Sequence, residues 1–235
     1  MKILKKAVLI IHGFTGNLYD NEYLMNYLEL DNEYDVYART LPGHNKDRFS
    51  GSNSNEWKKS VDEQIEELIN NGYTKIYVIG HSMGGVLATY LASKYKEVKK
   101  IVLINAAFLY ANVKQDKEKV KNSEFSKFGR LWEKVLRTSP MIFYEFTKLV
   151  KEGQNYLSSV KCDTLILRSL NDEIIPYEAG ELIYNKINTN NKWLTNVKDA
   201  PHTLLSSERK IDASIYIKTF LKGGKKWKKN FKKEI

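Results

Sequence analysis

Residues 80–85 read GHSMGG, a G-x-S-x-G pattern in which a serine can act as a nucleophile. The pattern follows a short apolar run at 75–79 and precedes a helix-forming run at 86–92. A serine on a sharp strand-to-helix turn exposes its hydroxyl at the carboxyl end of a sheet, and the helix directs its first N–H groups toward a developing oxyanion. We therefore predict that Ser82 is a catalytic nucleophile. The alternative is a glycine-rich turn without chemistry.

A serine nucleophile needs a base within hydrogen-bond reach, and the base needs an acid to orient it. The chain has four histidines. His12 follows the first apolar run, His44 lies in an early turn, and His81 adjoins the nucleophile with its side chain directed away from that of Ser82. Only His202 lies in a late loop before the last helix, where the chain order nucleophile, acid, base on a parallel sheet places the base.

The acid is expected between the nucleophile and the base, after the fifth predicted strand at 164–167. Asp172 is the first carboxylate past that strand, and it is the predicted acid. Glu173 begins the same loop and is its rival, whereas Asp163 precedes the strand and lies at the wrong end of the sheet. The alternative for Asp172 is a turn or helix-cap aspartate.

An oxyanion needs two main-chain donors. The residue after the nucleophile supplies one in such an elbow, so we predict the N–H of Met83. The loop after the first strand supplies the other, and within residues 12–16 the candidate is the N–H of Phe14. The ring of Phe14 would then line the acyl side of the site, unless it is an ordinary core phenylalanine.

Apolar runs and helical patterns alternate along the chain. The continuous apolar run at 7–11 has no alternation and fits a strand buried on both faces. We predict further strands at 34–39, 75–79, 101–104, 164–167 and 192–197. Helical patterns lie at 19–30, 57–69, 83–95, 178–187 and 204–221. This alternation predicts an α/β fold with a mostly parallel sheet of about six strands and helices on both faces. Ligands then bind beyond the carboxyl ends of the strands.

One stretch interrupts the alternation. Between about 108 and 160 there is no strand-like run, and aromatic residues recur at helical spacing. We predict a single domain over 1–221 with a helical cap insertion at about 108–160, because an insertion after the fourth strand emerges at the binding edge of the sheet. The alternative is an additional helical layer packed on the core.

The net charge of +10 is concentrated at the carboxyl end. Residues 222–235 hold seven lysines and one glutamate, so the other 221 residues carry only +4, which argues against a nucleic-acid partner. Trp227, Phe231 and Ile235 recur every four residues, as in a basic amphipathic helix that makes weak contact with an anionic membrane surface. We favour the alternative, a solvated and fraying Lys-rich terminus.

Other compositional features place the chain in a broad class. A single cysteine, Cys162, excludes an intramolecular disulfide. No run approaches the roughly 18 apolar residues of a membrane span, and the first apolar run is too short for a signal peptide. We therefore expect a cytoplasmic protein.

Several motifs in order carry a resemblance to a known family. They are HGFTG at 12–16, LPGH at 41–44, GHSMGG at 80–85, DEIIP at 172–176 and PH at 201–202. Together they resemble an α/β-hydrolase, and most of all bacterial carboxylesterases and monoacylglycerol lipases. The resemblance covers about residues 7–221. It implies a Ser82-His202-Asp172 triad, an oxyanion pair of Phe14 and Met83, and a helical cap.

The expected activity is hydrolysis of carboxylic esters through an acyl-enzyme on Ser82, with no metal or organic cofactor. The substrate would be a small-molecule ester with an uncharged acyl chain of short to medium length, or a monoacylglycerol. Hydrolysis of amides or thioesters and acyl transfer would use the same triad and remain alternatives. A ligand-binding protein without catalysis is less favoured because the triad is intact.

Overall fold

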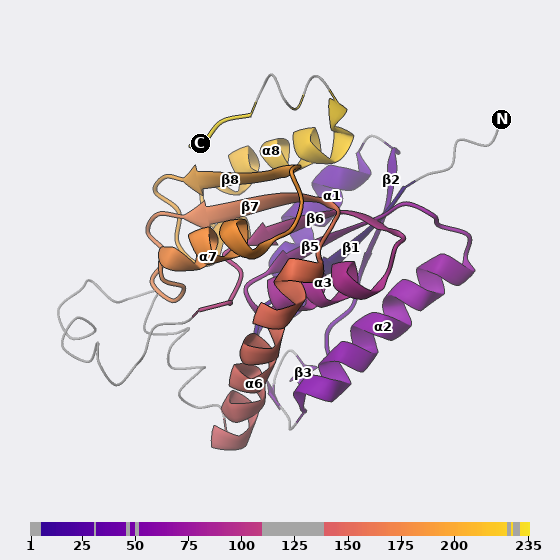
Figure 1. Cartoon of the computed structure of the whole chain (residues 1–235), viewed down its shortest axis with the longest axis vertical. Coiled ribbons are helices and arrows are strands. Elements are labelled where there is room, and N and C mark those ends of the chain that lie inside the picture. Colours follow the sequence, from indigo (N-terminus) through magenta and orange to yellow (C-terminus); the bar gives the residue numbers. More distant parts are fainter. Residues whose placement is uncertain are drawn as a thin grey trace.

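Six parallel strands form one sheet in the order β2-β1-β5-β6-β7-β8 (Figure 1). The computed structural model describes residues 6–30, 32–45, 48–49, 52–109, 139–224, 227 and 231–235. The strands are β1 (Lys6–Ile11), β2 (Tyr34–Ala38), β5 (Ile76–His81), β6 (Val98–Ile104), β7 (Asp163–Ser169) and β8 (Lys192–Val197). All six predicted strands are thus confirmed, with bounds that differ by a few residues. A short antiparallel pair, β3 (His44–Asn45) and β4 (Arg48–Phe49), was not predicted.

The strand order places the site. The chain passes from β1 to β2 on one side and then returns to place β5 on the other side of β1. Ligands of open parallel sheets bind where the strand order reverses, beyond the carboxyl ends of the strands. The predicted oxyanion loop follows β1 and the predicted nucleophile follows β5. The topology therefore brings these two segments to the same point.

Helices cover both faces of the sheet. Helices α1 (Glu22–Glu29) and α8 (Lys210–Lys222) pack on one face, with the short 3-10 helices η1 (Leu18–Asn21) and η3 (Leu204–Ser206) beside them. The other face holds α2 (Ser54–Asn70), α3 (Met83–Lys94) and α7 (Glu178–Lys186). In Figure 1, α3 and α7 lie in front of the sheet and α1 lies behind it.

The residues of β1 show why both faces are covered. Alternate side chains of a strand point to opposite faces. Ala7, Leu9 and Ile11 belong to the core beneath α2 and α3, whereas Val8 and Ile10 belong to the core beneath α1 and α8. All of them are at most 2% exposed. An apolar run without alternation is thus divided between two cores.

Helix α6 (Pro140–Tyr156), followed by the 3-10 helix η2 (Leu157–Ser159), is the described part of the predicted cap insertion. The rest of that prediction, residues 110–138, lies outside the described residues. Helix α6 contacts α3 and α2. Glu145 accepts hydrogen bonds from the main chain and hydroxyl of Ser54 at 3.1 and 2.7 Å, and Lys58 pairs with Glu152 at 2.7 Å. These contacts hold α6 against the start of α2.

The described residues of the carboxyl-terminal segment pack on the domain, so the expectation of a fraying, solvated terminus is wrong for them. Trp227 is only 2% exposed and its ring packs against Trp193, Tyr216 and Phe220. The final residues pair with β8: the N–H of Ile235 donates to the carbonyl of Asn196 at 2.9 Å. The apolar positions that suggested a membrane-facing stripe therefore contact the protein itself.

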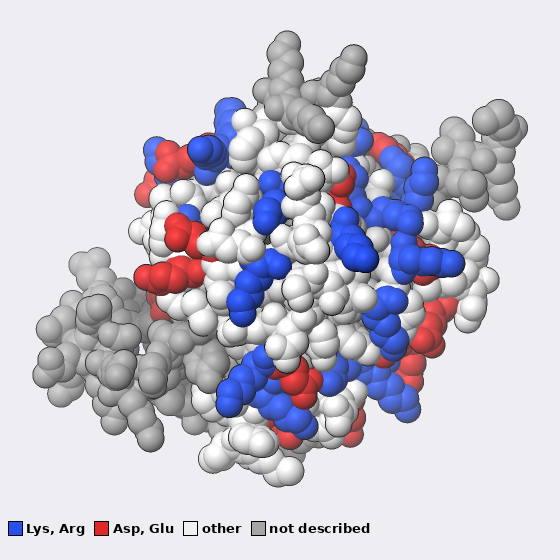
Figure 2. Space-filling model, viewed as in Figure 1, with Lys and Arg blue, Asp and Glu red and all other residues white. Residues whose placement is uncertain are grey.

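Charged side chains of both signs are mixed on the surface. On the face in Figure 2, basic and acidic side chains lie side by side rather than gathering by sign. This agrees with the low net charge of the body. None of the helices that the structure describes is long and apolar enough to cross a membrane.

Candidate active site

Ser82 lies on a strained turn between β5 and α3. Its φ and ψ are 53° and −118°, in a region that serine rarely adopts. The turn is possible because of two glycines: a Cβ on Gly80 would collide with the main chain of Gly84, and one on Gly84 would collide with the main chain of Ile11. The elbow is therefore packed directly against the end of β1.

His202 and Asp172 meet in the loops that follow β8 and β7. The Nδ1 of His202 lies 2.8 Å from Oδ2 and 3.1 Å from Oδ1 of Asp172, and the side chains are only 5% and 4% exposed. Oδ1 of Asp172 also accepts the N–H groups of Ile174 and Ile175, each at 2.8 Å. A carboxylate facing Nδ1 selects the tautomer with its proton on Nδ1, so the lone pair is on Nε2.

The loops that carry Asp172 and His202 are joined through their main chains. The N–H of Leu170 donates to the carbonyl of Val197 at 2.9 Å, and that of Asn171 donates to Ala200 at 3.2 Å. Arg168, on β7, also holds the end of the loop that carries Asp172, since its Nη1 donates to the carbonyl of Tyr177 at 2.7 Å. Asp172 and His202 are therefore placed as one unit.

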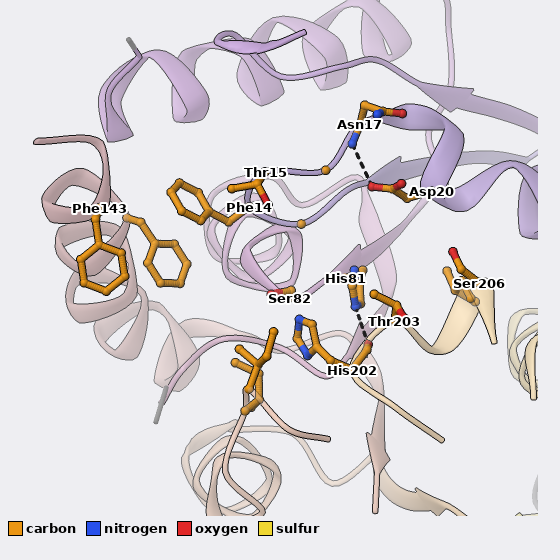
Figure 3. Close-up of a pocket in the computed structure, with 16 residues that line it drawn as sticks. Phe14, Thr15, Asn17, Asp20, His81, Ser82, Phe143, His202, Thr203 and Ser206 are labelled. Carbon is orange, nitrogen blue, oxygen red and sulfur yellow. Dashed lines mark hydrogen bonds between the residues drawn. The ribbon is translucent and has the colours of Figure 1, made fainter. Parts of the chain in front are cut away.

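Ser82 and His202 line the same pocket, together with the loop that follows β1. Figure 3 shows the ring of His202 beside Ser82. Aromatic and aliphatic side chains form one part of the pocket: Phe14, Phe143, Phe146, Ile174 and Ile175. Polar side chains form another part: Thr15, Asn17, Asp20, Thr203 and Ser206. In Figure 3, Phe14 and Phe143 lie on one side of Ser82, and Asn17, Asp20 and Ser206 lie on the other.

The loop after β1 passes very close to Ser82. A Cβ on Gly13 would lie 3.1 Å from the Cβ of Ser82. His12 supports the loop, because its Nε2 accepts the N–H of Leu41 at 2.9 Å while Nδ1 lies 2.8 Å from the carbonyl oxygen of Gly13. Burial lowers the pKa of His12, so this ring stays neutral. On the other side, α3 begins at Met83, within the turn whose N–H groups lack partners inside the helix.

The two remaining histidines have structural contacts. Burial lowers the pKa of His81 to about 3, and its Nε2 donates to the main-chain oxygen of His202 at 2.9 Å. His81 lines the pocket as well. Burial also lowers the pKa of His44 to about 3, where its ring packs edge-on against His12 and Trp57. Both rings are neutral at ordinary pH.

Two residues at the site have contacts that the sequence alone did not predict. Asn105 donates from Nδ2 to the main-chain oxygen of His202 at 2.9 Å, and Glu173 accepts the main-chain N–H of His202 at 3.0 Å. Asn105 is the first residue after β6, as Ser82 is the first after β5. A polar residue directly after an apolar strand run is the signal that would have drawn attention to it.

The described ranges contain no group of three or more histidine, cysteine, aspartate or glutamate side chains that could hold a metal ion. The polar atoms around Ser82 are instead those of an imidazole, a carboxylate and main-chain amides. This set suits nucleophilic acyl transfer.

A serine on an elbow beside a histidine–aspartate pair, at the carboxyl edge of a parallel sheet, is the arrangement of serine hydrolases. The sequence model of the alpha/beta hydrolase fold matches residues 6–155 of the chain. The protein belongs to the alpha/beta hydrolase fold family, as the resemblance of its motifs indicated.

Curated relatives cover most of the chain. A carboxylesterase of Bacillus subtilis (strain 168) is 27% identical over 224 residues, which are 88% of each protein. A thermostable monoacylglycerol lipase of Bacillus sp. (strain H-257) is 26% identical over 213 residues, covering 83% of this chain and 82% of the lipase.

Solved structures agree with the fold. A structure from the work on LipS and LipT, two metagenome-derived lipolytic enzymes, superposes with a TM-score of 0.77 at 20% identity and covers 94% of both chains. The monoacylglycerol lipase of Paleococcus ferrophilus superposes with a TM-score of 0.72 at 19% identity, covering 92% of this chain and 93% of the lipase. At such identities the likeness concerns the fold.

Proposed function

We propose that the protein hydrolyses carboxylic esters with Ser82 as nucleophile, His202 as general base and Asp172 as the acid that orients the base. The observation that carries the proposal is the 2.8 Å contact between Nδ1 of His202 and Oδ2 of Asp172, in a loop pair that lines one pocket with Ser82. The carboxylesterase and monoacylglycerol lipase relatives support the same reaction class. The protein is a carboxylic ester hydrolase.

The reaction proceeds in two steps. Oγ of Ser82 attacks the ester carbonyl carbon while Nε2 of His202 takes the hydroxyl proton, and Asp172 stabilises the imidazolium. The carbon–oxygen bond to the alcohol then breaks, and the alcohol leaves with the proton from His202. Water gives a proton to Nε2 and attacks the acyl-enzyme, which releases the carboxylic acid and returns the proton to Ser82.

The main-chain N–H groups of Met83 and Phe14 are the proposed donors to the oxyanion. Helix α3 begins at Met83, and the loop that carries Phe14 passes so close to Ser82 that a Cβ on Gly13 would lie 3.1 Å from the Cβ of Ser82. Donors held in place before the reaction stabilise charge as it develops, and one such donor contributes about 3 kcal/mol. The strained conformation of Ser82 allows α3 to begin directly after it, at Met83.

The division of the pocket suggests which parts of the ester bind where. An uncharged acyl chain of short to medium length suits the apolar part around Phe143 and Phe146, whereas a hydroxyl-bearing alcohol such as glycerol suits the polar part around Asn17 and Asp20. A monoacylglycerol is therefore within the proposed substrate class. Helix α6, which supplies Phe143 and Phe146, belongs to the insertion that we propose as a cap. A cytoplasmic location and weak contact of the basic terminus with anionic membranes stay predictions.

Labelling with a fluorophosphonate, followed by intact mass, tests the nucleophile. We expect one adduct on the wild type and none on Ser82→Ala. An unlabelled wild type, or an adduct that persists in the variant, would refute the assignment. Turnover of p-nitrophenyl esters compared with the matching anilides and thioesters then separates ester hydrolysis from its alternatives.

The substitution Asp172→Asn tests the role of Asp172 as orienting acid, because asparagine has nearly the same shape as aspartate. The amide oxygen can still accept the N–H groups of Ile174 and Ile175, but the amide nitrogen then faces Nδ1 of His202 and favours the wrong tautomer. We expect kcat to fall by roughly 10³- to 10⁴-fold with an unchanged melting temperature. A variant that keeps more than a tenth of the wild-type kcat would contradict the role of Asp172.

A further inference from the structure

The main chain of His202 is held at both its N–H and its carbonyl by side chains of other segments. Its N–H donates to Oε2 of Glu173 at 3.0 Å. Its carbonyl oxygen accepts from Nε2 of His81 and Nδ2 of Asn105, each at 2.9 Å. These contacts are additional to the bond between the ring and Asp172. The end of β5 and the loops after β6 and β7 thus all contact one residue of the loop after β8.

Glu173 stands next to Asp172 in sequence, and the two carboxylates bind different parts of the same histidine. Asp172 binds the ring nitrogen, whereas Glu173 binds the main-chain nitrogen. Asp172 is in turn fixed by the main chain of its own loop. Asp172 and Glu173, which hold the ring and the main chain of His202, belong to one short loop and therefore keep a fixed spacing. This fixed spacing restricts the side-chain torsions of His202.

Asn105 provides the opposing support. Its φ is 45°, a left-handed conformation that asparagine tolerates better than most residues. Both ends of its buried amide are used: Oδ1 accepts the N–H of Ser169 at 2.8 Å, while Nδ2 donates to the hydroxyl of Ser169 and to the carbonyl of His202, each at 2.9 Å. The carbonyl of His202 is thereby tied to the ends of β6 and β7. Glu173 binds the N–H of the same residue, so both main-chain polar groups of His202 are held.

We propose that Glu173 is a positioning residue for the catalytic base, and that it acts by accepting the main-chain N–H of His202. This inference rests on the proposed role of His202. The base must deliver its Nε2 to the hydroxyl of Ser82 in acylation and to water in deacylation. A misplacement of about 1 Å costs up to roughly 100-fold in rate. Loss of the Glu173 contact frees one side of the His202 main chain and affects both steps.

A set of substitutions separates this role from a purely electrostatic one. Glu173→Gln keeps an acceptor at the same reach and removes the charge, whereas Glu173→Asp keeps the charge and shortens the reach by one methylene. Glu173→Ala removes both. Glu178→Ala, at an exposed glutamate in the first turn of α7, is the matched control. The assays are kcat and KM for a soluble p-nitrophenyl ester, the rate of fluorophosphonate labelling, and the melting temperature.

We expect the Ala and Asp variants to lose roughly tenfold in kcat and in labelling rate, with KM within about twofold, because the base is displaced while the pocket is unchanged. Glu173→Gln and the Glu178 control should resemble the wild type. An active Asp variant beside an impaired Gln variant would overturn the proposal in favour of a charge effect. Wild-type kcat in all variants would also overturn it, as would a change in KM alone. Failure of the proposed function itself would appear separately, as an unlabelled wild type.

Discussion

The rings of Phe14 and Phe146 stack with their centroids 4.7 Å apart and their planes inclined by 24°. One ring comes from the loop after β1 and the other from α6, so the proposed oxyanion loop and the proposed cap helix share one wall of the pocket. The bonds from Ser54 to Glu145 and the ion pair of Lys58 with Glu152 tie α6 to the start of α2. The apolar part of the pocket is therefore lined by a stacked aromatic pair whose helix is held in place.

Phe146→Ala should shift the preference of the enzyme toward longer acyl chains. Removal of the ring extends the apolar part of the pocket beside Phe143, whereas esters of short acids lose a contact. We expect the ratio of kcat/KM for an octanoyl ester to that for an acetyl ester to rise roughly tenfold, since a contact worth one or two methylenes changes this ratio by about that factor.

The control is Tyr144→Ala on the same helix, because this side chain is 63% exposed and does not line the pocket around Ser82. Its acyl preference should equal that of the wild type. An unchanged chain-length profile in Phe146→Ala would show that acyl chains do not enter this part of the pocket.

Trp227→Ala should destabilise the protein by roughly 3 to 5 kcal/mol, the usual cost of removing a buried tryptophan side chain. The ring contacts Trp193 on β8 and both Tyr216 and Phe220 on α8, so its loss leaves a cavity between the sheet and a helix. Urea unfolding followed by circular dichroism measures the change.

The control is Ile215→Ala on α8, the helix that Trp227 contacts. Ile215 is 47% exposed, so this substitution should change stability by less than about 0.5 kcal/mol. Equal stability of Trp227→Ala and the wild type would mean that the carboxyl-terminal segment does not contribute to the core in solution.

The free energy of unfolding should decrease as the pH falls below about 6.5. Burial lowers the pKa of His12, and lowers the pKa of both His44 and His81 from 6.5 to about 3. Between these values the unfolded chain binds protons that the native protein does not, so acid favours unfolding. Each such histidine contributes at most about 1.4 kcal/mol per pH unit.

Urea unfolding at pH 7.0, 6.0 and 5.5 measures this slope. His44→Asn keeps a donor for the carbonyl of Pro42, to which Nδ1 of His44 is bonded at 3.0 Å, and removes one titrating ring. The slope of this variant should be smaller than that of the wild type by about one proton's contribution. Identical slopes would contradict the assignment of His44 as a neutral buried ring.

The local pattern was sufficient for the six strands of the main sheet and for their approximate bounds, but not for the short pair β3 and β4. A continuous apolar run identified strands such as β1, because a strand buried on both faces has no polar side. The edge strands β2 and β8 carry polar side chains and are only partly buried, so their patterns were weaker. The end of α2 also has a local cause: Gly72, two residues after the helix, adopts a φ of 89°, which glycine tolerates without strain. Such features depend on residues that are adjacent in the sequence, so the sequence alone can predict them.

The terminus shows where a local pattern was misleading. Lysines around Trp227, Phe231 and Ile235 suggested a solvated end or a membrane-facing stripe, yet these apolar side chains pack against the protein. The same amphipathic pattern fits the apolar surface of a protein as well as that of a membrane. Which surface it contacts depends on the open edge of β8 and on the aromatic side chains of α8, which lie far from the terminus in sequence.

The sequence by itself determined the α/β class, the elbow at Ser82 and the choice of His202 as candidate base, because turn geometry and chain order restrict these choices strongly. Only the tertiary structure decided between Asp172 and Glu173 as the partner of the imidazole. It also showed that Asn105 and His81 both donate to the main-chain oxygen of His202. Neighbouring carboxylates in one loop are equivalent in sequence, and hydrogen-bond geometry separates them once strands distant along the chain lie side by side.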